Sequence, residues 1–258
     1  NILWYDWDFN AGGTPAMVAA GADLRAASAD FGVGWYTVRL TVSNAAARAT
    51  LVRTNYVRVA PAIAYVATNG GNVPPYATAG QAATSLQAAV DAAWAGADAG
   101  TLVQVAAGTY NVASPVGLAK GVTVRAPDGP GAVLVRSAAG VRCFDLAHAN
   151  AVLSGLALRG ADTSDFTYYG GAVMLLDGTI TNCRIRQSHV GGRGGAVYQS
   201  GGRLVDCTIS SNWVTEWQYG YGGGVYLASG LVDRCTIVSN ASQSRNGGAG
   251  VFVLTTRS

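Results

Sequence analysis

The chain has 258 residues, half of them hydrophobic, which is enough for one large domain or two smaller ones with a sizeable core. Only 12% of the residues are charged and the net charge is +3, which argues against a nucleic-acid partner, because phosphate binding needs clustered lysines and arginines. No apolar run reaches the roughly 18 residues of a membrane span, so none is expected. The chain begins at Asn1 without a Met or a signal peptide, as expected of a mature product or a fragment.

Residues 1–60 have the pattern of β-strands. Segment 34–44, GWYTVRLTVSN, alternates apolar and polar residues with period two, which is typical of a half-buried strand. Its apolar positions are Tyr36, Val38, Leu40 and Val42. Further strands are predicted at 3–9 and 49–60.

Two segments of this region match a known family. WDFNAGG at 7–13 and GWYTVRLTVSN at 34–44 resemble the W-D-F-G-D-G and G-x-Y-T-V-x-L-T-V-x-N segments of PKD-type immunoglobulin-like sandwiches. The turn aspartate of that family is missing here, which leaves a ligand role for the turn unsupported. The family also has earlier strands before W-D-F. We therefore expect 1–60 to be an incomplete PKD/Ig-like β-sandwich, either truncated or completed by a strand from another chain.

Residues 61–258 are the second predicted domain. The segment TSLQAAVDAAWAGADAG places apolar residues at helical spacing after Thr84 or Ser85 as N-cap, which predicts a capping helix over 85–97. The apolar face consists of Leu86, Ala89, Val90, Ala93, Trp94 and Ala97. Short strands separated by Gly, Asn and Ser follow at 101–110, 121–125, 132–136, 142–146 and 151–158.

The C-terminal part is a sequence repeat. Three units, 170–188, 194–212 and 222–240, place a Gly-Gly-small-Val start so that Val precedes a Cys by ten residues, and a fourth start follows at Gly247. Successive cysteines are 24 and then 28 residues apart. Repeats of this length built from short strands predict a β-solenoid.

Within each unit a Cys and an Ile are separated by one residue. Because successive side chains of a strand point to opposite faces, the Cys and the Ile should both point inward and the residue between them outward. Because stacked coils lie about 4.8 Å apart, the cysteines should form a buried column. Its members are Leu156, Cys183, Cys207 and Cys235. We favour free thiols acting as small apolar side chains; a disulfide between coils would need non-parallel Cβ vectors, and a metal site would need a His pair nearby.

Asn212 and Asn240 follow the inward isoleucines by three residues, and Ser188 takes the equivalent place. Asn tolerates the left-handed conformation of a sharp turn, so these residues are expected at the corners of the coils. All length variation between units falls after this corner. The variable loops should therefore emerge along one edge, at 160–170, 189–193, 213–221 and 241–246.

The succession of motifs over about 65–258 supports a second resemblance. The helix, GTLVQVAAGTY, GVRCFDLAHANAVLSGLALRGA and the GGAVY…CTISSN units resemble secreted right-handed parallel β-helix repeat proteins of the pectin-lyase-like superfamily. The units are also similar to the repeats of polymorphic outer-membrane autotransporter passengers. The resemblance implies an all-β, right-handed parallel β-helix in an extracellular or cell-surface bacterial protein. It leaves activity open, because this architecture carries lyases, hydrolases and adhesive stalks.

The resemblance implies what an enzyme of this fold would need, namely an Asp cluster with Ca²⁺ and an Arg base in lyases, or paired Asp in hydrolases. Within the β-helix region Asp162 and Asp165 share a loop and are the only close acidic pair, and Asp206 is expected to pair with Arg234 across coils. His148 and His189 have no Ser or Cys partner in a nucleophile context. We therefore expect no catalytic residue, no metal site and no cofactor.

Aromatic residues in 164–171 and 212–223 lie on the predicted loop edge. They could form a strip that stacks on sugars or docks a protein, or they could fold over the solenoid as satellite core. The residues of this candidate surface are Phe166, Tyr168, Tyr169, Trp213, Trp217, Tyr219 and Tyr221.

The expected function is that of a non-catalytic extracellular or cell-surface structural or adhesive protein. Both ends of the chain look open, which suits a head-to-tail fibre of identical copies. The expected partners are therefore copies of the chain itself or surface glycans. The alternatives are a polysaccharide lyase or glycoside hydrolase, which would need converging carboxylates, and a carbohydrate-binding surface module, which would rest on the aromatic strip.

Overall fold

The computed structural model describes residues 2, 4–13, 17–94, 100–218, 220–245 and 247–254. The chain is nearly all β and divides into two compact units, Asn1–Pro61 and Ala62–Ser258. None of the helices within the described ranges has the length and apolar character that a membrane crossing requires.

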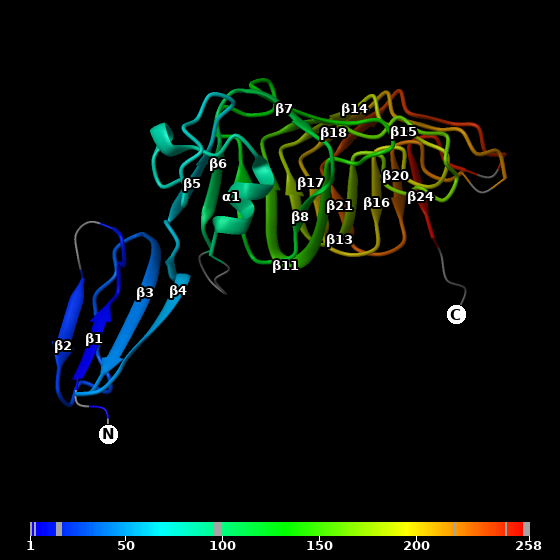
Figure 1. Cartoon of the computed structure of the whole chain (residues 1–258). Coiled ribbons are helices and arrows are strands. Elements are labelled where there is room, and N and C mark those ends of the chain that lie inside the picture. The colour runs from blue at the N-terminus through cyan, green and yellow to red at the C-terminus, as the bar shows by residue number, and fades with distance from the viewer. Residues whose placement is uncertain are drawn as a thin grey trace. The chain divides into compact units, whose positions relative to one another are not determined.

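The first unit is one antiparallel sheet of four strands in the order β2-β1-β3-β4 (Figure 1). The strands are β1 (Trp4–Asp8), β2 (Val18–Gly21), β3 (Gly34–Ser43) and β4 (Arg48–Val59). Three of them lie where the sequence pattern predicts strands. The short VAAG segment of β2 was not predicted, because four small or apolar residues carry no alternation.

One face of this sheet has little covering it. A hollow of about 380 Å³ is lined by Trp7, Val38, Leu40, Leu51, Arg53 and Tyr56. Leu51 and Tyr56 are 53% and 67% exposed, respectively. Within residues 2, 4–13 and 17–61 there is no second sheet, so this unit has one layer where a sandwich has two.

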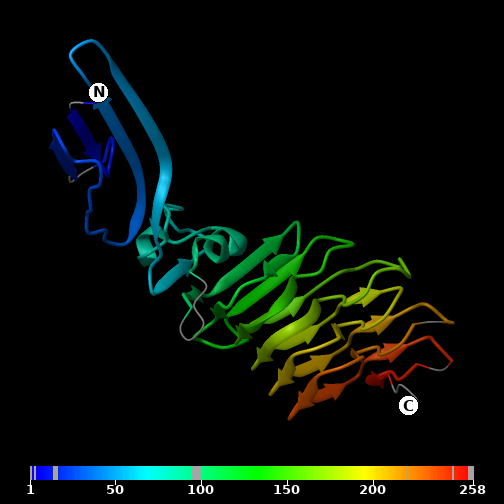
Figure 2. The ribbon, with the colours of Figure 1, turned by 90° about the horizontal axis from the view of Figure 1, so that it is seen from below.

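The second unit is a parallel β-solenoid of about five turns. Figure 2 shows its coils stacked so that equivalent strands lie side by side. The first face is a six-stranded sheet of β7 (Gly108–Val112), β10 (Val133–Ser137), β12 (Ala157–Arg159), β14 (Arg184–Arg186), β18 (Thr208–Ser210) and β22 (Thr236–Val238).

A larger sheet forms the opposite wall. Its main path of strands is β5 (Ile63–Val66), β6 (Leu102–Val105), β9 (Thr123–Arg125), β11 (Phe144–Ser154), β13 (Val173–Thr181), β16 (Val197–Gln199), β20 (Val225–Leu227) and β24 (Val251–Val253). Strands paired beside this path are β8 (Val116–Leu118), β17 (Arg203–Val205) and β21 (Leu231–Asp233). A third, short sheet contains β15 (His189–Val190), β19 (Trp213–Val214) and β23 (Ala241–Ser242).

Helix α1 (Leu86–Ala92) packs on β5, β6 and β8 and follows a 3-10 turn at Ala79–Gln81. Ser85 is the N-cap, as predicted, and its hydroxyl accepts a hydrogen bond from the Ala88 backbone N–H. The buried side chains of the helix face the solenoid interior, as expected of a cap.

The helix is shorter than the predicted 85–97. Ala93 already has extended backbone, and Trp94, predicted on the buried face, is 65% exposed. The Trp94 N–H donates to Thr101 Oγ1 at 2.8 Å, and Lys120 Nζ donates to the Ala93 carbonyl at 2.6 Å. These contacts replace the hydrogen bonds that a further turn would make. Residues 95–97 lie outside the described part of the chain.

The paired glycines of each repeat have distinct tasks. Gly194 has φ +69°, a left-handed conformation that side chains other than glycine adopt at a cost. Gly195 packs so closely on the backbone of Gly223 in the next coil that a Cβ atom would not fit. The same pair of features recurs in the other units, so the Gly-Gly motif marks the return from the loop into a tightly stacked strand.

The structure places the predicted cysteine column inside the solenoid. Leu156, Cys183 and Cys207 are buried and Cys235 is half-buried, and all three cysteines are free thiols. The residue after each cysteine of the column donates its backbone N–H to the carbonyl of the column residue one coil earlier, at 2.8 to 2.9 Å. The Cys183 N–H also donates to Cys207 Sγ at 3.4 Å, so the thiols serve as packing and weak acceptor groups.

The predicted role of the asparagines in the corner is wrong by one residue. The left-handed residues are Ser211 and Ser239, with φ 57° and 55°, and they immediately precede Asn212 and Asn240. A serine at the turn leaves the following side chain pointing inward. Asn212 is 1% exposed and donates from Nδ2 to the carbonyl of Ile185 at 3.1 Å.

These asparagines form a hydrogen-bonded ladder from coil to coil. Asn212 Oδ1 accepts from the Ser188 N–H, and Asn240 Oδ1 accepts from the Asn212 N–H, both at 3.0 Å. Ser188 continues the series, because its hydroxyl accepts from the Gly160 N–H at 2.9 Å. Backbone groups at the corner are not hydrogen-bonded within the sheets, and the side chains of the ladder serve as their hydrogen-bond partners.

Candidate functional site

The seven aromatic residues predicted as a ligand surface divide into two groups. Phe166, Trp213 and Trp217 are 67%, 43% and 57% exposed, respectively. They lie on the loops and the short third sheet that follow the Asn corner, and they leave apolar area in contact with solvent. This group has the chemistry of a sugar-stacking or docking surface.

Tyr168 belongs to the second group, which packs on the protein. Its ring lies against the buried residues Val190 and Val214, and its hydroxyl accepts from the Arg142 backbone N–H at 2.7 Å. The Arg142 guanidinium lies 4.7 Å from the ring centre. Tyr219 lies outside the described residues.

An outward column of aromatic rings runs along the large sheet. Tyr198 and Tyr226 are opposite each other in register, with ring centres 5.1 Å apart and planes 8° apart. Tyr226 and Phe252 continue the column at 5.4 Å. Burial raises the pKa of Tyr226, as expected of a hydroxyl held under a covering layer.

Tyr169 and Tyr221 belong to that covering layer. Tyr169 stacks on Tyr198 at 5.4 Å and Tyr221 on Phe252 at 4.4 Å. The Arg193 guanidinium lies over Tyr169 and Tyr221, 5.5 and 5.7 Å from the ring centres. These two tyrosines therefore form a satellite core and present little surface of their own to a ligand.

A groove opens beside the exposed Trp213. It has a volume of about 380 Å³ and lies where the six-stranded sheet turns the corner into the short third sheet. It is lined by Arg136, Ser137, Ala138, Ala139, Arg159, Gly160, Asp162, Gln187, Ser188, His189, Ser211 and Trp213.

His189 is fixed within this groove by its neighbours. Its Nδ1 lies 2.9 Å from Asp162 Oδ1, its Nε2 lies 3.2 Å from Thr215 Oγ1, and its ring stacks on Trp213 at 5.1 Å. No Ser or Cys partner was predicted for His189, and the hydroxyl that lies beside it in the structure is that of Thr215 from the next coil. A fixed imidazole of this kind can hold or donate a proton to a ligand in the groove.

The acidic pair Asp162 and Asp165 does not act as a unit. Asp162 bonds to His189, whereas Asp165 accepts hydrogen bonds from the backbone N–H and hydroxyl of Thr167 at 2.8 and 2.7 Å. The hydroxyl bond is the main reason that the pKa of Asp165 lies below its usual range. Over the described ranges no group of three His, Cys, Asp or Glu side chains is placed to hold a metal ion.

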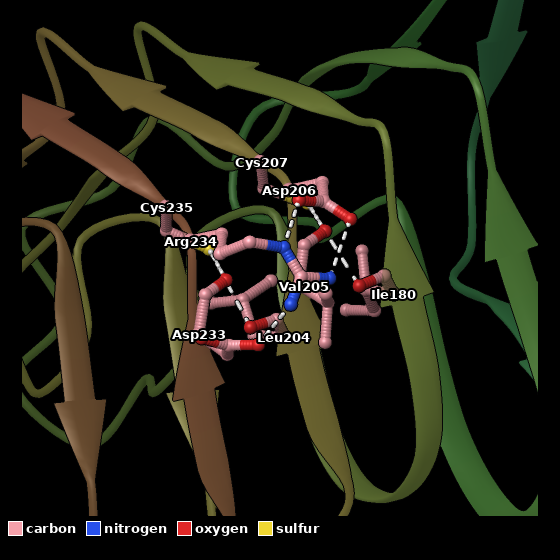
Figure 3. A network of polar contacts seen from close by, with 8 residues as sticks. All are labelled: Ile180, Leu204, Val205, Asp206, Cys207, Asp233, Arg234 and Cys235. Carbon is pink, nitrogen blue, oxygen red and sulfur yellow. Dashed lines mark hydrogen bonds and ion pairs between the residues drawn. The ribbon is translucent and has the colours of Figure 1, made fainter.

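Asp206 and Arg234 form the ion pair between coils that their register predicts (Figure 3). Arg234 donates from Nε and Nη2 to the two carboxylate oxygens of Asp206, at 2.8 and 3.0 Å. Its Nη1 also donates to Asp233 at 2.6 Å. The hydrogen bonds from Arg234 hold the pKa of Asp206 below its usual range, and the Asp206–Arg234 pair joins neighbouring coils.

The arginines of the groove belong to a feature that the sequence analysis missed. Arg136 and Arg159 are opposite each other in register on neighbouring strands, each one position after an inward residue. The signal was present in the motifs LVR, ALR and RIR at 134–136, 157–159 and 184–186. It is not apparent in the cysteine-aligned units, because only RIR lies within one of them and the other two motifs precede the first unit.

We compared the chain with protein-family models, with curated proteins and with solved structures, and none of the three comparisons found a match.

Proposed function

We propose that the chain is a non-catalytic structural and adhesive protein of the extracellular space or cell surface. The observation that carries this proposal is the row of exposed aromatics, Phe166, Trp213 and Trp217, on the loop edge of a regularly laddered solenoid. A rigid scaffold that presents aromatic side chains at one edge suits binding to sugars or proteins. The pectin-lyase-like and autotransporter resemblances of the sequence agree with this proposal.

A glycan-binding and glycan-cleavage assay on the same samples tests it. The full chain should bind immobilised polysaccharides without releasing new chain ends. Trp213→Ala/Trp217→Ala should weaken that binding, whereas Trp94→Ala, which removes a tryptophan that is 65% exposed in the capping region, should not. Release of oligosaccharides at a steady rate would refute the non-catalytic part of the proposal.

We also propose that the first unit completes a PKD-like sandwich by pairing with another sheet, which would allow copies to assemble into a fibre. The support is the uncovered apolar face around Leu51 and Tyr56. Sedimentation velocity should show assemblies that grow with concentration. Tyr56→Glu should reduce them, and Val18→Glu, at an exposed position that does not line the hollow, should not. Purely monomeric protein at every concentration would contradict assembly.

A polysaccharide lyase is the second candidate, favoured by the position of His189. A lyase removes a proton next to a carboxylate, and the groove holds an imidazole together with Arg136 and Arg159. The test is the ultraviolet absorbance of unsaturated uronate products, compared between the natural chain and His189→Ala. Product formation that depends on His189 would favour this candidate over the adhesive one.

A further inference from the structure

We propose that the outer face of the six-stranded sheet binds an anionic polysaccharide directly through a column of arginines, with Trp213 as the stacking platform for a sugar ring and without a bridging calcium ion. This inference rests on the proposed adhesive function and names its ligand class. The arginine column is defined as Arg136, Arg159 and Arg186, with Arg184 beside it on β14.

The register of the parallel strands brings these arginines together. Arg136 is opposite Arg159, and the pairing of Leu158 with Ile185 places Arg159 opposite Arg186 one residue further along. Val135, Leu158 and Ile185 are fully buried, so the alternating arginines point outward. Consecutive members are therefore about 4.8 Å apart along the solenoid axis. The net charge of the chain is only +3 and therefore gives no indication of this local concentration of positive charge.

The column lacks the partners that other arginines of the solenoid have. Arg234 is held by two carboxylates, Arg142 lies over Tyr168, and Arg193 lies over three tyrosine rings. Over the described residues, the four guanidinium groups of the face have no ion pair, side-chain hydrogen bond or aromatic contact, and all four residues are exposed.

Like charges directly opposite each other on neighbouring strands destabilise a sheet. An anion that bridges two guanidinium groups would remove that repulsion and would accept hydrogen bonds from their planar forks. The gain recurs along the three coils of the column, so a linear polymer with regularly repeated negative groups matches the column better than a single small anion.

The groove at the corner identifies the polymer as a glycan. Arg136 and Arg159 line it together with Trp213, a residue that is 43% exposed. An aromatic face beside guanidinium groups suits a sugar ring that carries a carboxylate or sulfate. Asp162, the carboxylate in the groove, has one oxygen 2.9 Å from His189 Nδ1.

Calorimetric titration of the full chain tests the inference. The ligands are dextran sulfate, polygalacturonate, neutral dextran and a DNA duplex, each with and without a calcium chelator. Both anionic glycans should bind, neutral dextran should bind much more weakly, and the chelator should change nothing. The sulfated and carboxylated arms distinguish the two sources of negative charge.

Two double variants with the same loss of charge provide the decisive comparison. Arg159→Gln/Arg186→Gln should weaken glycan binding about 2- to 30-fold, the range for two exposed ion pairs. Arg125→Gln/Arg203→Gln removes two exposed arginines from the larger sheet and should leave binding within about twofold. Both pairs of residues are exposed, so the variants should fold, which circular dichroism checks.

Equal losses in the two double variants, a requirement for calcium, or tighter binding of the DNA duplex would each overturn the inference. The proposed adhesive function fails separately. It would survive if neutral dextran bound through Trp213 while the arginine variants had no effect, and it would fail if no ligand bound or if the glycans were cleaved.

Discussion

Replacement of Asn212 by alanine tests whether the asparagine ladder is a structural requirement of the solenoid. The side chain is 1% exposed, accepts from the Ser188 N–H at 3.0 Å and donates to the Ile185 carbonyl at 3.1 Å. Alanine would leave both buried backbone groups without these partners. Since an unsatisfied buried group costs about 1–3 kcal/mol, Asn212→Ala should lower the free energy of unfolding by about 2–6 kcal/mol.

Asn240→Ala is the matched control. Asn240 makes the equivalent bond, from Nδ2 to the Ile209 carbonyl at 2.9 Å, but it is only partly buried. Asn240 lies between β22 and β23, the last described strands of their two sheets, so a water molecule can take the place of its side chain and the loss should be about 1 kcal/mol. Urea unfolding followed by circular dichroism measures both variants, and hydrogen exchange of the Ser188 amide reports the local effect. Equal losses of stability in Asn212→Ala and Asn240→Ala, or unchanged exchange protection of the Ser188 amide in Asn212→Ala, would refute the reasoning.

Three further predictions concern packing and titration. Ile209→Ala removes a fully buried side chain and should lower the free energy of unfolding in urea by about 2–5 kcal/mol. Thr208→Ala, on the outer side of the strand, should change it by no more than about 0.5 kcal/mol, and similar values for the two variants would contradict the inward column. Gly195→Ala forces a Cβ against the backbone of the next coil and should cost about 1–3 kcal/mol, whereas Gly131→Ala, which has open space around it, should be tolerated in the same assay. Burial raises the pKa of the Cys143 thiol from 9.0 to about 12, so its contribution to stability is complete below pH 9 and is lost between pH 9 and about 12. Unfolding titrations of Cys143→Ala should therefore show a smaller loss of stability over that range than the natural chain, and an identical pH dependence would contradict this assignment.

The coil architecture was predictable because its signals are local and repeated. Cys207 and Ile209 are separated by one residue and therefore point to the same face of their strand. The equivalent residues of the other units recur at a fixed place in each unit, and this register defines both the inward column and the Asp206–Arg234 pair. The wall strands and the N-cap at Ser85 follow from alternation and capping chemistry in the same way.

The remaining features depend on contacts between coils of unequal length. The pairing of His189 with Asp162 and Thr215 requires the register of three successive loops, which no single segment specifies. Helix α1 ends early because Thr101 and Lys120, remote in sequence from its start, capture the backbone of Trp94 and Ala93. The aromatic residues of the predicted strip look alike in the sequence. Contacts with Arg142 and Arg193, which come from other loops and coils, mark the tyrosines that pack on the protein, namely Tyr168, Tyr169 and Tyr221.

The stacked rings of Tyr198, Tyr226 and Phe252 also give the protein an intrinsic optical label. The ring centres in this column lie 5.1 and 5.4 Å apart, so each ring has a fixed and asymmetric environment as long as the coils stay stacked. A near-ultraviolet circular dichroism band from these immobilised rings would report the order of the coils containing β16, β20 and β24, independently of the backbone signal. Loss of that band before the far-ultraviolet signal would show these coils separating while the rest of the solenoid remains wound.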